Sequence, residues 1–278
     1  MINVRPKSGV SSIIQNTMAS YQKEQPLFAD KKSNDFVIKI ANTLEEREAA
    51  FRLAYEVYLS KGYIKPNFNQ ILTYPYDKDP ESTILIILDS QKNVVGSVTL
   101  VFDNSTKLPA EKIFGTEIQS IKTNGEKLVE LCRLVISPHY RNSKEILVLL
   151  FNYLIIYSYF IKNFDGLVVE VHPKHKNYYK NLLKFDEIGS EKFCPQVQGT
   201  IGVLMHLPLI RFQEEVVRCA GFLENKIKDR TLYPYFIKPA QVNLVVYYLK
   251  KQKRPISEEE KIYFGLSGSS QSLMAVGS

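Results

Sequence analysis

Apolar residues between positions 36 and 207 follow two different periods, and each period predicts one type of element. Runs that alternate or are continuously apolar predict strands, whereas recurrence at helical spacing predicts helices. The expected strands are 36–40, 82–88, 94–102, 127–136, 167–171 and 200–207. The expected helices are 43–62, 145–163 and 176–183, and the segments 63–80 and 108–124 are expected to be loops or connectors with short helical turns.

The order of these elements predicts an α/β (α+β) fold with one mixed central sheet flanked by helices. A short polar turn joins 82–88 to 94–102, which predicts an antiparallel hairpin. The long helix joins 127–136 to 167–171, and such a crossover predicts that these two strands are parallel. Fold class by itself does not assign a function.

The flanking segments differ from this central domain, 36–207. Residues 1–35 are polar without a clear period and are expected to form a flexible arm. Residues 208–266 are expected to form a basic, mostly helical extension, and the small polar residues 267–278 a disordered tail. We therefore expect one catalytic domain with additions at both ends.

Positive charge is concentrated in the extension. The whole chain carries a formal charge of +7, and between Leu207 and Ile256 alone ten Lys or Arg stand against four Asp or Glu. Nucleic acid, an anionic membrane or an acidic protein would each suit such a surface, and a solvated helix face is a further explanation. No recognition helix or RNA-binding motif accompanies the charge, so we expect an acidic protein partner and no nucleic acid.

Composition excludes several classes of protein. An apolar fraction of 45% and a charged fraction of 23% exclude a disordered or collagen-like chain. The widely spaced Cys132, Cys194 and Cys219 form neither a disulfide framework nor a zinc pattern, which fits the cytoplasm. Residues 1–20 lack the layout of a signal peptide. The apolar stretch 146–161 is shorter than a membrane span of roughly 20 residues, so we expect a buried helix, with a membrane segment as the lesser alternative.

Several short motifs resemble one group of acyltransferases. Residues 51–58 (FRLAYEVY) and 130–134 (ELCRL) resemble the first-helix and Glu-x-x-Arg-Phe motifs of the acyl-homoserine lactone synthases. A closer resemblance, to the long-chain N-acyl amino acid synthases of the N-acyltyrosine synthase type, rests on 96–101 (GSVTLV), 108–109 (LP), 172–175 (HPKH), Tyr178, Tyr179 and Phe185. The resemblance implies a GNAT-like fold. It also implies transfer of a medium- or long-chain fatty acyl group from acyl carrier protein to the amine of an amino acid, with a tyrosine-like acceptor.

The donor site departs from the usual GNAT pattern. Ordinary members bind coenzyme A through a Gln/Arg-x-x-Gly-x-Gly/Ala loop at the start of the long helix, where backbone N–H groups hold the pyrophosphate. Here Lys144 and Ile146 replace the two glycines. Side chains at these positions are expected to obstruct a pyrophosphate, whereas Arg141 and Lys144 could meet a single phosphopantetheine phosphate or the acidic carrier surface. A basic helix start without that role is the plainer alternative.

Attack of an amine on a thioester needs a proton acceptor and a proton for the leaving thiolate. Glu130 is the candidate acceptor, directly or through water. By resemblance, Tyr179 protonates the thiolate, although packing is an equal alternative for a tyrosine. His175 follows a strand end and could be a base, a substrate contact or a loop anchor.

The strand 127–136 is also expected to supply the oxyanion donor. The resemblance implies that it splays from its neighbour and that a freed backbone N–H among Leu134, Val135 and Ile136 polarises the carbonyl. Regular alternation would place Glu130, Cys132 and Leu134 on one face and Leu131, Arg133 and Val135 on the other. Glu130 and Arg133 are then expected not to share a face.

Two arginines are candidates for binding the carboxylate of the acceptor. Arg52 could do so with a two-pronged hydrogen bond, or could form a surface ion pair with Glu56. Arg133 could bind a carboxylate or fix a neighbouring loop. Ala54 and Thr99 stand where the acyl-homoserine lactone synthases carry arginine, which weakens a lactone-synthase interpretation.

No metal site and no cofactor are expected, because the acyl-phosphopantetheine enters as a carrier-bound substrate. Two alternatives remain open. One is an acyl-homoserine lactone synthase, which consumes S-adenosylmethionine. The other is a non-catalytic GNAT-like module that binds acyl carrier protein or nucleic acid through its basic extension.

Overall fold

The computed structural model describes residues 36–267 apart from 105–106, 195–199, 221–229 and 253. The chain divides into two units, Met1–Asp35 and Phe36–Ser278, and every described residue belongs to the second. The expected arm at 1–35 and nearly all of the expected tail at 267–278 thus lie outside the described residues.

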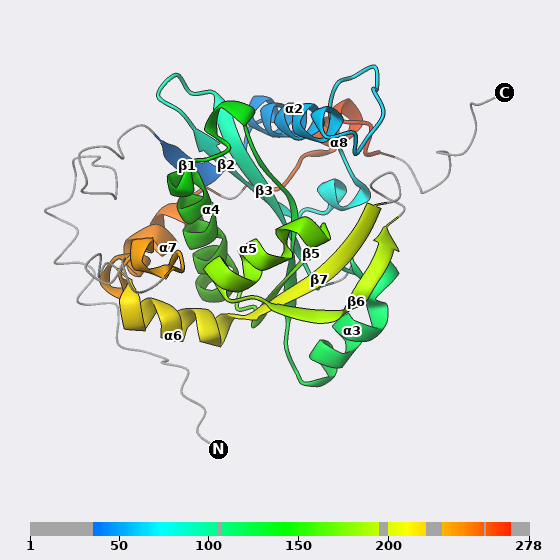
Figure 1. Ribbon diagram of the computed structural model, residues 1–278. Helices are drawn as coiled ribbons and strands as arrows, with labels where there is room; N and C mark the ends of the chain where they lie inside the picture. Colours follow the sequence, from blue (N-terminus) through cyan, green and yellow to red (C-terminus); the bar gives the residue numbers. More distant parts are fainter. Residues whose placement is uncertain (1–35, 105–106, 195–199, 221–229, 253, 268–278) are drawn as a thin grey trace, which may run out of the picture. The chain divides into compact units, whose positions relative to one another are not determined.

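A seven-stranded mixed sheet in the order β1-β2-β3-β4-β5-β7-β6 forms the centre of this unit (Figure 1). Its strands are β1 (Val37–Ile40), β2 (Thr83–Leu88), β3 (Val94–Phe102), β4 (Leu128–Ile136), β5 (Gly166–Val171), β6 (Asp186–Cys194) and β7 (Thr200–Pro208). β2 and β3 are antiparallel, and β4 and β5 are parallel, as the hairpin and the crossover predicted. All other neighbouring strands are antiparallel.

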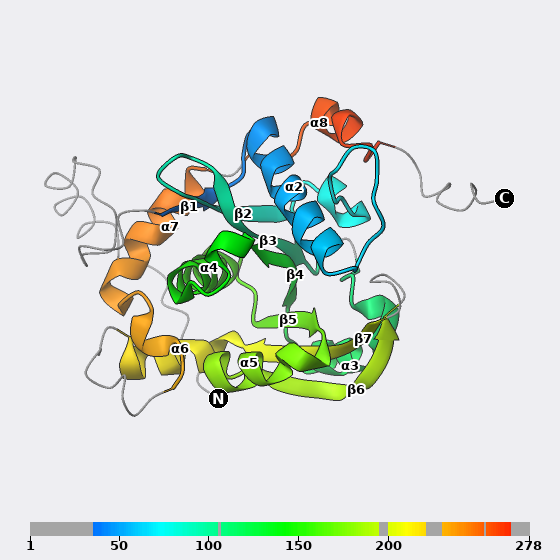
Figure 2. The same cartoon turned by 45° about the horizontal axis from the view of Figure 1, so that its top comes forward.

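Helices cover both faces of the sheet (Figure 2). The helices are α2 (Leu44–Ser60), α3 (Glu111–Thr123), α4 (Lys144–Ile156), α5 (Pro173–Leu183), α6 (Leu209–Cys219), α7 (Val242–Lys250) and α8 (Glu258–Tyr263). Short helical turns are η1 (Pro75–Lys78), η2 (Pro138–Tyr140), η3 (Tyr157–Ile161), η6 (Tyr233–Tyr235) and η7 (Pro239–Gln241). The fold class is therefore the one predicted.

Side-chain contacts distinguish the two faces. On one face Phe51 of α2 packs with Ile84 and Ile86, and Phe114 of α3 packs with Val101. On the other face α4 lies against β2 and β3, and a Cβ atom at Gly96 would lie 3.2 Å from Cγ2 of Ile146. We call these the α2 face and the α4 face.

Two elements differ from the sequence prediction. The connector 108–124 contains the helix α3, whose Phe114 and Ile118 are fully buried. The edge strand β6 was not predicted at all. It is mostly exposed and charged, without the alternation that a half-buried strand shows, and Gly189 breaks its regular geometry with a φ of 76°. Its pairing with β7 decides its conformation, so no local pattern announces it.

The predicted long helix comprises α4 and η3 (Lys144–Ile161). This stretch is long and apolar enough to cross a membrane by length and composition, but 67% of it is buried inside the protein. Such burial is typical of a core helix, because a helix that packs its apolar side chains against a sheet leaves few apolar side chains to contact lipid. The expectation of a buried helix fits this packing.

The C-terminal extension packs on the same unit instead of standing apart. Helix α7 contacts α4, β1 is joined to the segment after α7, and α8 lies beside α2 (Figure 1). Inside the core, the Oδ1 atom of Asn152 in α4 accepts a hydrogen bond from the Ile237 backbone N–H at 2.9 Å. The extension 208–266 contains α6, α7 and α8, while 221–229 lie outside the described residues.

Candidate active site

Strand β4 carries a bulge at the residues that the sequence singled out. Arg133 and Leu134 together occupy the place opposite the single residue Val98 of β3. Arg133 has a φ of 48°, in the left-handed region that few residues other than glycine adopt. Backbone conformations of this kind cost about 1–3 kcal/mol and persist where the surrounding contacts enforce them.

The bulge overturns the predicted alternation of faces. Beyond the bulge, the alternation of side chains in β4 is shifted relative to the residues before it, and Val135 packs with residues of α2. The Arg133 side chain lies on the α2 face too, because it donates a hydrogen bond to Thr99 Oγ1 at 2.8 Å and covers the Phe51 ring. Glu130 and Arg133 therefore share a face, contrary to the prediction, since a period of two assumes a regular strand.

Glu130 is a buried carboxyl group held by two donors. The Ala110 backbone N–H donates to its Oε2 atom at 2.8 Å, and the Cys132 thiol donates to its Oε1 atom at 3.6 Å. Ala110 directly follows the Leu108-Pro109 motif, so that motif presents the amide to Glu130. Burial raises the pKa of Glu130 to about 8, and the nearby Glu170 contributes to the rise. The group thus exchanges its proton close to neutral pH, as a general base must.

Glu170 is a half-buried carboxyl group on the α2 face, and the sequence analysis missed it. It projects from β5, two residues beyond the last pair formed with β4. Burial raises its pKa, and its carboxylate accepts a hydrogen bond from the Cys194 thiol. A Cβ atom at position 202 would lie 2.5 Å from Glu170 Oε1, so the glycine at this position leaves room for the Glu170 carboxyl group. A glutamate within an otherwise apolar strand (GLVVEV) was the available signal.

Arg133 makes a buried ion pair with Asp77 of η1. Its Nη1 atom donates to Asp77 Oδ2 at 2.9 Å and to the Leu72 carbonyl at 2.6 Å, and its Nη2 atom donates to Asp77 Oδ1. Tyr74 and Tyr76 flank the guanidinium, whose Cζ atom lies 5.6 and 5.3 Å from their ring centroids. Of its two predicted roles, the contacts match the fixing of a neighbouring loop.

Tyr58 of α2 lies within electrostatic range of both Arg133 and Tyr179. Burial raises the pKa of the Tyr58 hydroxyl, on which Tyr74, Arg133, Cys132 and Tyr179 also act electrostatically. The sequence pattern placed Tyr58 only among the apolar positions of its helix. An aromatic residue with a polar tip satisfies the same periodicity as a leucine, so periodicity does not distinguish the two.

Tyr179 lies on α5 and is buried among aromatic rings. Its ring centroid lies 5.4 Å from that of Phe185 and 6.3 Å from that of Phe151. Burial raises the pKa of its hydroxyl, and the neighbouring Tyr178 adds to the effect. The hydroxyl therefore keeps its proton at neutral pH, which a donor to a thiolate requires.

His175 stands near the start of α5, on the exposed surface. Partial burial and the positive charges of Lys174 and Lys61 lower its pKa, so its imidazole is neutral at pH 7. No contact in the described part of the chain joins His175 to Glu130. His172 caps the same helix, with Nδ1 accepting a hydrogen bond from the Lys174 N–H at 3.2 Å.

Pairing between β4 and β5 ends before β4 reaches the candidate backbone donors. The two strands pair only from Leu128 to Glu130 on the β4 side, although β4 continues to Ile136. Ser137 N–H bonds to Val95 of β3 at 2.9 Å. Backbone groups alternate between the two edges of a strand, so the Ile136 N–H is directed to the other edge. We therefore favour Ile136 over Val135 as the freed donor.

Arg52 lies apart from this constellation. Its Nε and Nη2 atoms donate to Glu48 Oε1 at 2.9 and 2.6 Å, so its ion-pair partner is Glu48 and not the Glu56 expected from the sequence. It lines a surface hollow together with residues 68–71 and Tyr263 of α8. No contact in the described residues joins Arg52 to Glu130 or Arg133.

The start of α4 corrects one part of the donor-site argument. Ile146 is fully buried and packs towards Gly96 of β3, so its side chain points into the core and does not obstruct the helix start. Ser143 Oγ accepts a hydrogen bond from the Ile146 N–H at 3.3 Å and caps the helix. Arg141 and Lys144 are exposed on either side of this cap.

The basic run of the extension is not one uniform surface. Lys250 and Lys251 are exposed, and Lys251 lies over the Tyr247 ring at 4.2 Å. Arg254 instead pairs with Glu260 at 2.6 Å, and Lys253 lies outside the described residues. Arg254 therefore has a structural partner, which the charge count could not reveal.

The three cysteines are free thiols. Within the described residues, no three His, Cys, Asp or Glu side chains are grouped so that they could hold a metal ion.

Comparison of the chain with solved structures finds proteins of similar fold. The solved structure of FeeM, an N-acyl amino acid synthase from uncultured soil microbes, has a TM-score of 0.55 at 22% identity and covers 63% of this chain and 92% of that one. The AHL synthase LasI has a TM-score of 0.47 at 14% identity, with coverages of 63% and 90%. A putative N-acetyltransferase from Lactobacillus plantarum has a TM-score of 0.45 at 12% identity, with coverages of 63% and 99%.

Among curated protein sequences, none matches the chain significantly. The family model described as N-acyl amino acid synthase FeeM matches residues 49–208, which contain the bulge, Glu130, Glu170 and the Arg133–Asp77 pair. Because this match covers more than half of the sequence, the chain belongs to the FeeM family of N-acyl amino acid synthases and is an acyltransferase.

Proposed function

We propose that this acyltransferase moves a medium- or long-chain fatty acyl group from an acyl carrier protein thioester to the amine of an amino acid. The observation that carries the proposal is the position of Glu130. This carboxyl group has a pKa of about 8 and lies where β4 and β5 cease to pair. A tyrosine-like acceptor is proposed from the sequence resemblance.

In the proposed reaction the amine nitrogen attacks the thioester carbonyl carbon, and the carbon–sulfur bond breaks. The proton lost by the amine passes to Glu130, directly or through a water molecule. The Ile136 N–H stabilises the oxyanion, with Leu134 and Val135 as its neighbours in the strand. Tyr179 donates a proton to the thiolate, and its hydroxyl holds that proton at neutral pH because burial raises its pKa.

His175 and the two arginines take secondary places in this scheme. His175, neutral at pH 7, remains a second candidate base or a substrate contact at the start of α5. Arg52 remains a candidate for binding the acceptor carboxylate only if it releases Glu48, because its Nε and Nη2 atoms both donate hydrogen bonds to Glu48. Arg133 acts on the acceptor through the loop that it fixes, since Asp77 and the Leu72 carbonyl occupy its guanidinium.

The carrier-protein donor is supported by the charge around the start of α4 and on the extension. Exposed Arg141 and Lys144 flank a helix start whose partial positive charge attracts a phosphate. Lys238, Lys250 and Lys251 are exposed on the extension, and complementary charge speeds the encounter with an acidic partner. We propose that no cofactor is needed and that the enzyme acts in the cytoplasm.

The test is an assay with matched acyl-carrier-protein and acyl-coenzyme A donors and a panel of amino acids, with products identified by mass. We expect turnover from the carrier-protein donor and an N-acyl amino acid as product. Equal or faster turnover with coenzyme A would overturn the donor assignment. A lactone product that consumes S-adenosylmethionine would overturn the acceptor assignment. Binding of nucleic acid at low salt without turnover would favour the non-catalytic alternative.

A further inference from the structure

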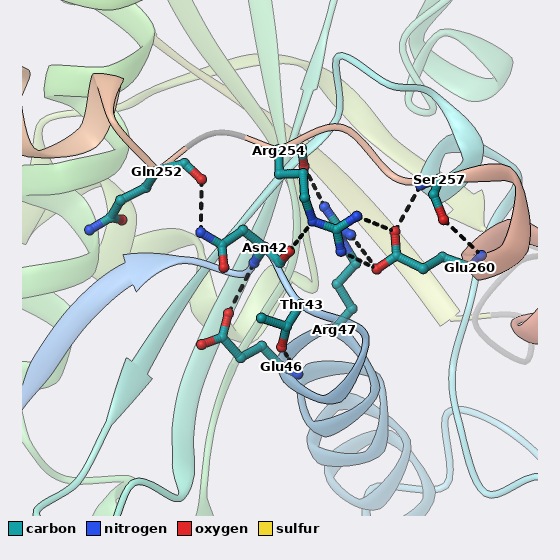
Figure 3. Close-up of polar contacts among 8 residues, drawn as sticks. All are labelled: Asn42, Thr43, Glu46, Arg47, Gln252, Arg254, Ser257 and Glu260. Atoms are coloured by element: carbon teal, nitrogen blue, oxygen red, sulfur yellow. Dashed lines mark hydrogen bonds and ion pairs between the residues drawn. The ribbon is translucent and has the colours of Figure 1, made fainter.

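The segment after α7 folds back over the start of α2. We call this segment the C-terminal clasp, formed by Gln252, Arg254, Ser257, Glu260 and Phe264. Figure 3 shows its polar members converging on the end of β1 and the first turn of α2, two elements more than 200 positions earlier in the sequence. The clasp lies outside residues 49–208, the part that the family model matches.

Glu260 is the centre of the clasp. Its Oε1 atom accepts hydrogen bonds from Arg47 Nη1 at 2.7 Å and Arg254 Nη2 at 2.6 Å, and its Oε2 atom accepts one from the Ser257 N–H at 2.7 Å. Arg47 also donates to the Arg254 carbonyl at 2.5 Å. The side chains of Arg47 and Glu260 are only 7% and 6% exposed, so solvent screens this pair weakly.

A second set of bonds holds the junction between β1 and α2. The Gln252 Oε1 atom accepts a hydrogen bond from the Ile40 N–H at 3.0 Å, and the Gln252 carbonyl accepts one from Asn42 Nδ2 at 2.9 Å. Arg254 Nε donates to the Asn42 carbonyl. Together these bonds fix where α2 begins relative to the sheet.

An aromatic contact leads from the clasp to the candidate active site. The rings of Phe264 and Phe51 meet edge to face with centroids 4.9 Å apart. The guanidinium of Arg133, which lies on β4, is 4.9 Å from the centroid of the Phe51 ring. All three residues are buried. A small cavity of about 20 Å³ lies beside Phe51, with Arg254 from the clasp and Asp77 from the site among its lining residues.

We propose that the C-terminal clasp positions Arg133 for acyl transfer, with Phe264 acting through Phe51. Arg133 is the first residue of the bulge, so its side chain and the backbone of 134–136 move together. Phe51 covers one side of the Arg133 guanidinium, while Asp77, Tyr74 and Tyr76 contact its other sides. This inference rests on the proposed site, and it assigns a positioning role to residues that lie outside the family match.

The first experiment compares Phe264→Ala with Phe264→Leu and with a control in α8, the helix that Phe264 directly follows. Ile262 is 68% exposed, so Ile262→Ala removes a similar apolar group from α8 without touching Phe51. We expect Phe264→Ala to lower kcat by about tenfold with a smaller change in KM, because a small displacement of reacting groups is costly. Phe264→Leu should restore most of kcat, and Ile262→Ala should leave it unchanged.

A double-mutant cycle with Arg133→Lys separates positioning from general destabilisation. If Phe264 acts through Arg133, Phe264→Ala should lower kcat much less in the Arg133→Lys background than in the parent. An equal loss in both backgrounds, or a folded Phe264→Ala enzyme with parental kcat and KM, would overturn the proposal.

Hydrogen exchange gives a readout that needs no turnover. The Leu72 N–H donates to the Phe51 carbonyl at 3.1 Å, and the Asp77 N–H donates to the Tyr74 carbonyl at 2.9 Å. We expect these two amides to exchange faster in Phe264→Ala, while amides in the centre of β3 stay protected. A parent protein without acyl transfer would refute the proposed function alone, whereas unchanged exchange at Leu72 and Asp77 would refute the clasp proposal alone.

Discussion

Two buried clusters of arginine and carboxylate lie in the described part of the chain, and the pKa values of their carboxyl groups shift in opposite directions. In the site cluster, burial raises the pKa of Asp77, although Arg133 and the Tyr74 N–H oppose the rise. In the clasp, burial also favours a higher pKa for Glu260, but bonds from Arg254, Ser257 and Arg47 outweigh it and the pKa falls. The direction of the pKa shift depends on whether desolvation or the hydrogen bonds and charges around the carboxylate dominate.

The difference separates two uses of a buried charge. The clasp surrounds one carboxylate with donors, so that the charge fastens two distant parts of the chain. The site keeps Glu130 among apolar residues with two donors, so its proton is exchanged near pH 8. Variants that remove one charge from each cluster should therefore affect stability and turnover differently.

Glu130→Gln is expected to have the largest effect on turnover. Loss of the base should lower kcat by about 10²–10⁴-fold. Stability should not fall at pH 8, because a carboxyl group with a raised pKa stabilises the fold mainly below its unfolded pKa and loses that contribution as pH rises through about 8. Steady-state kinetics and urea unfolding on the same preparation measure both, and unchanged kcat would remove Glu130 from the mechanism.

Asp77→Asn is expected to have the largest effect on stability. The substitution leaves the buried Arg133 without a counter-charge, which typically costs about 3–5 kcal/mol of unfolding free energy. The exposed Glu56 of α2 provides the control, since Glu56→Gln should change stability little. Urea unfolding at pH 7 measures both, and a loss as small as that of the control would show that the ion pair contributes little.

Glu260→Gln should destabilise the clasp by about 2 kcal/mol, because hydrogen bonds to a charged group are lost. The pKa of Glu260 is lowered, so its contribution is present above the unfolded pKa and is lost as pH falls through the folded one. The stability difference from the parent should therefore shrink in acid. Glu258→Gln on the same helix, 76% exposed in the side chain, is the matched control.

Glu170→Gln should give the smallest effect, a shift in the pH profile. The charge of Glu170 is one cause of the raised pKa of Glu130, so its removal should lower that pKa. The rising limb of kcat/KM against pH should move to lower pH while the maximum changes less. A limb that stays in place would show that desolvation alone sets the pKa of Glu130.

The regular parts of the fold were predictable because their signals are local. The hairpin of β2 and β3 and the crossover through α4 follow from periods within each segment. Strand β6 escaped prediction because its exposed, charged sequence acquires its conformation only by pairing with β7. The site residues Glu130 and Arg133 were recognised from their motif, but their common face was not, because the bulge shifts the alternation.

The sequence by itself determined the type and order of most elements, the resemblance to a family of acyltransferases, and the concentration of charge in the extension. Only the tertiary structure decided what each charge meets. Asp77 and Arg133 are 56 positions apart, and Arg47 and Glu260 are 213 apart. No local period records such pairings, because they form only when the sheet brings distant segments together and burial makes an unpaired charge too costly.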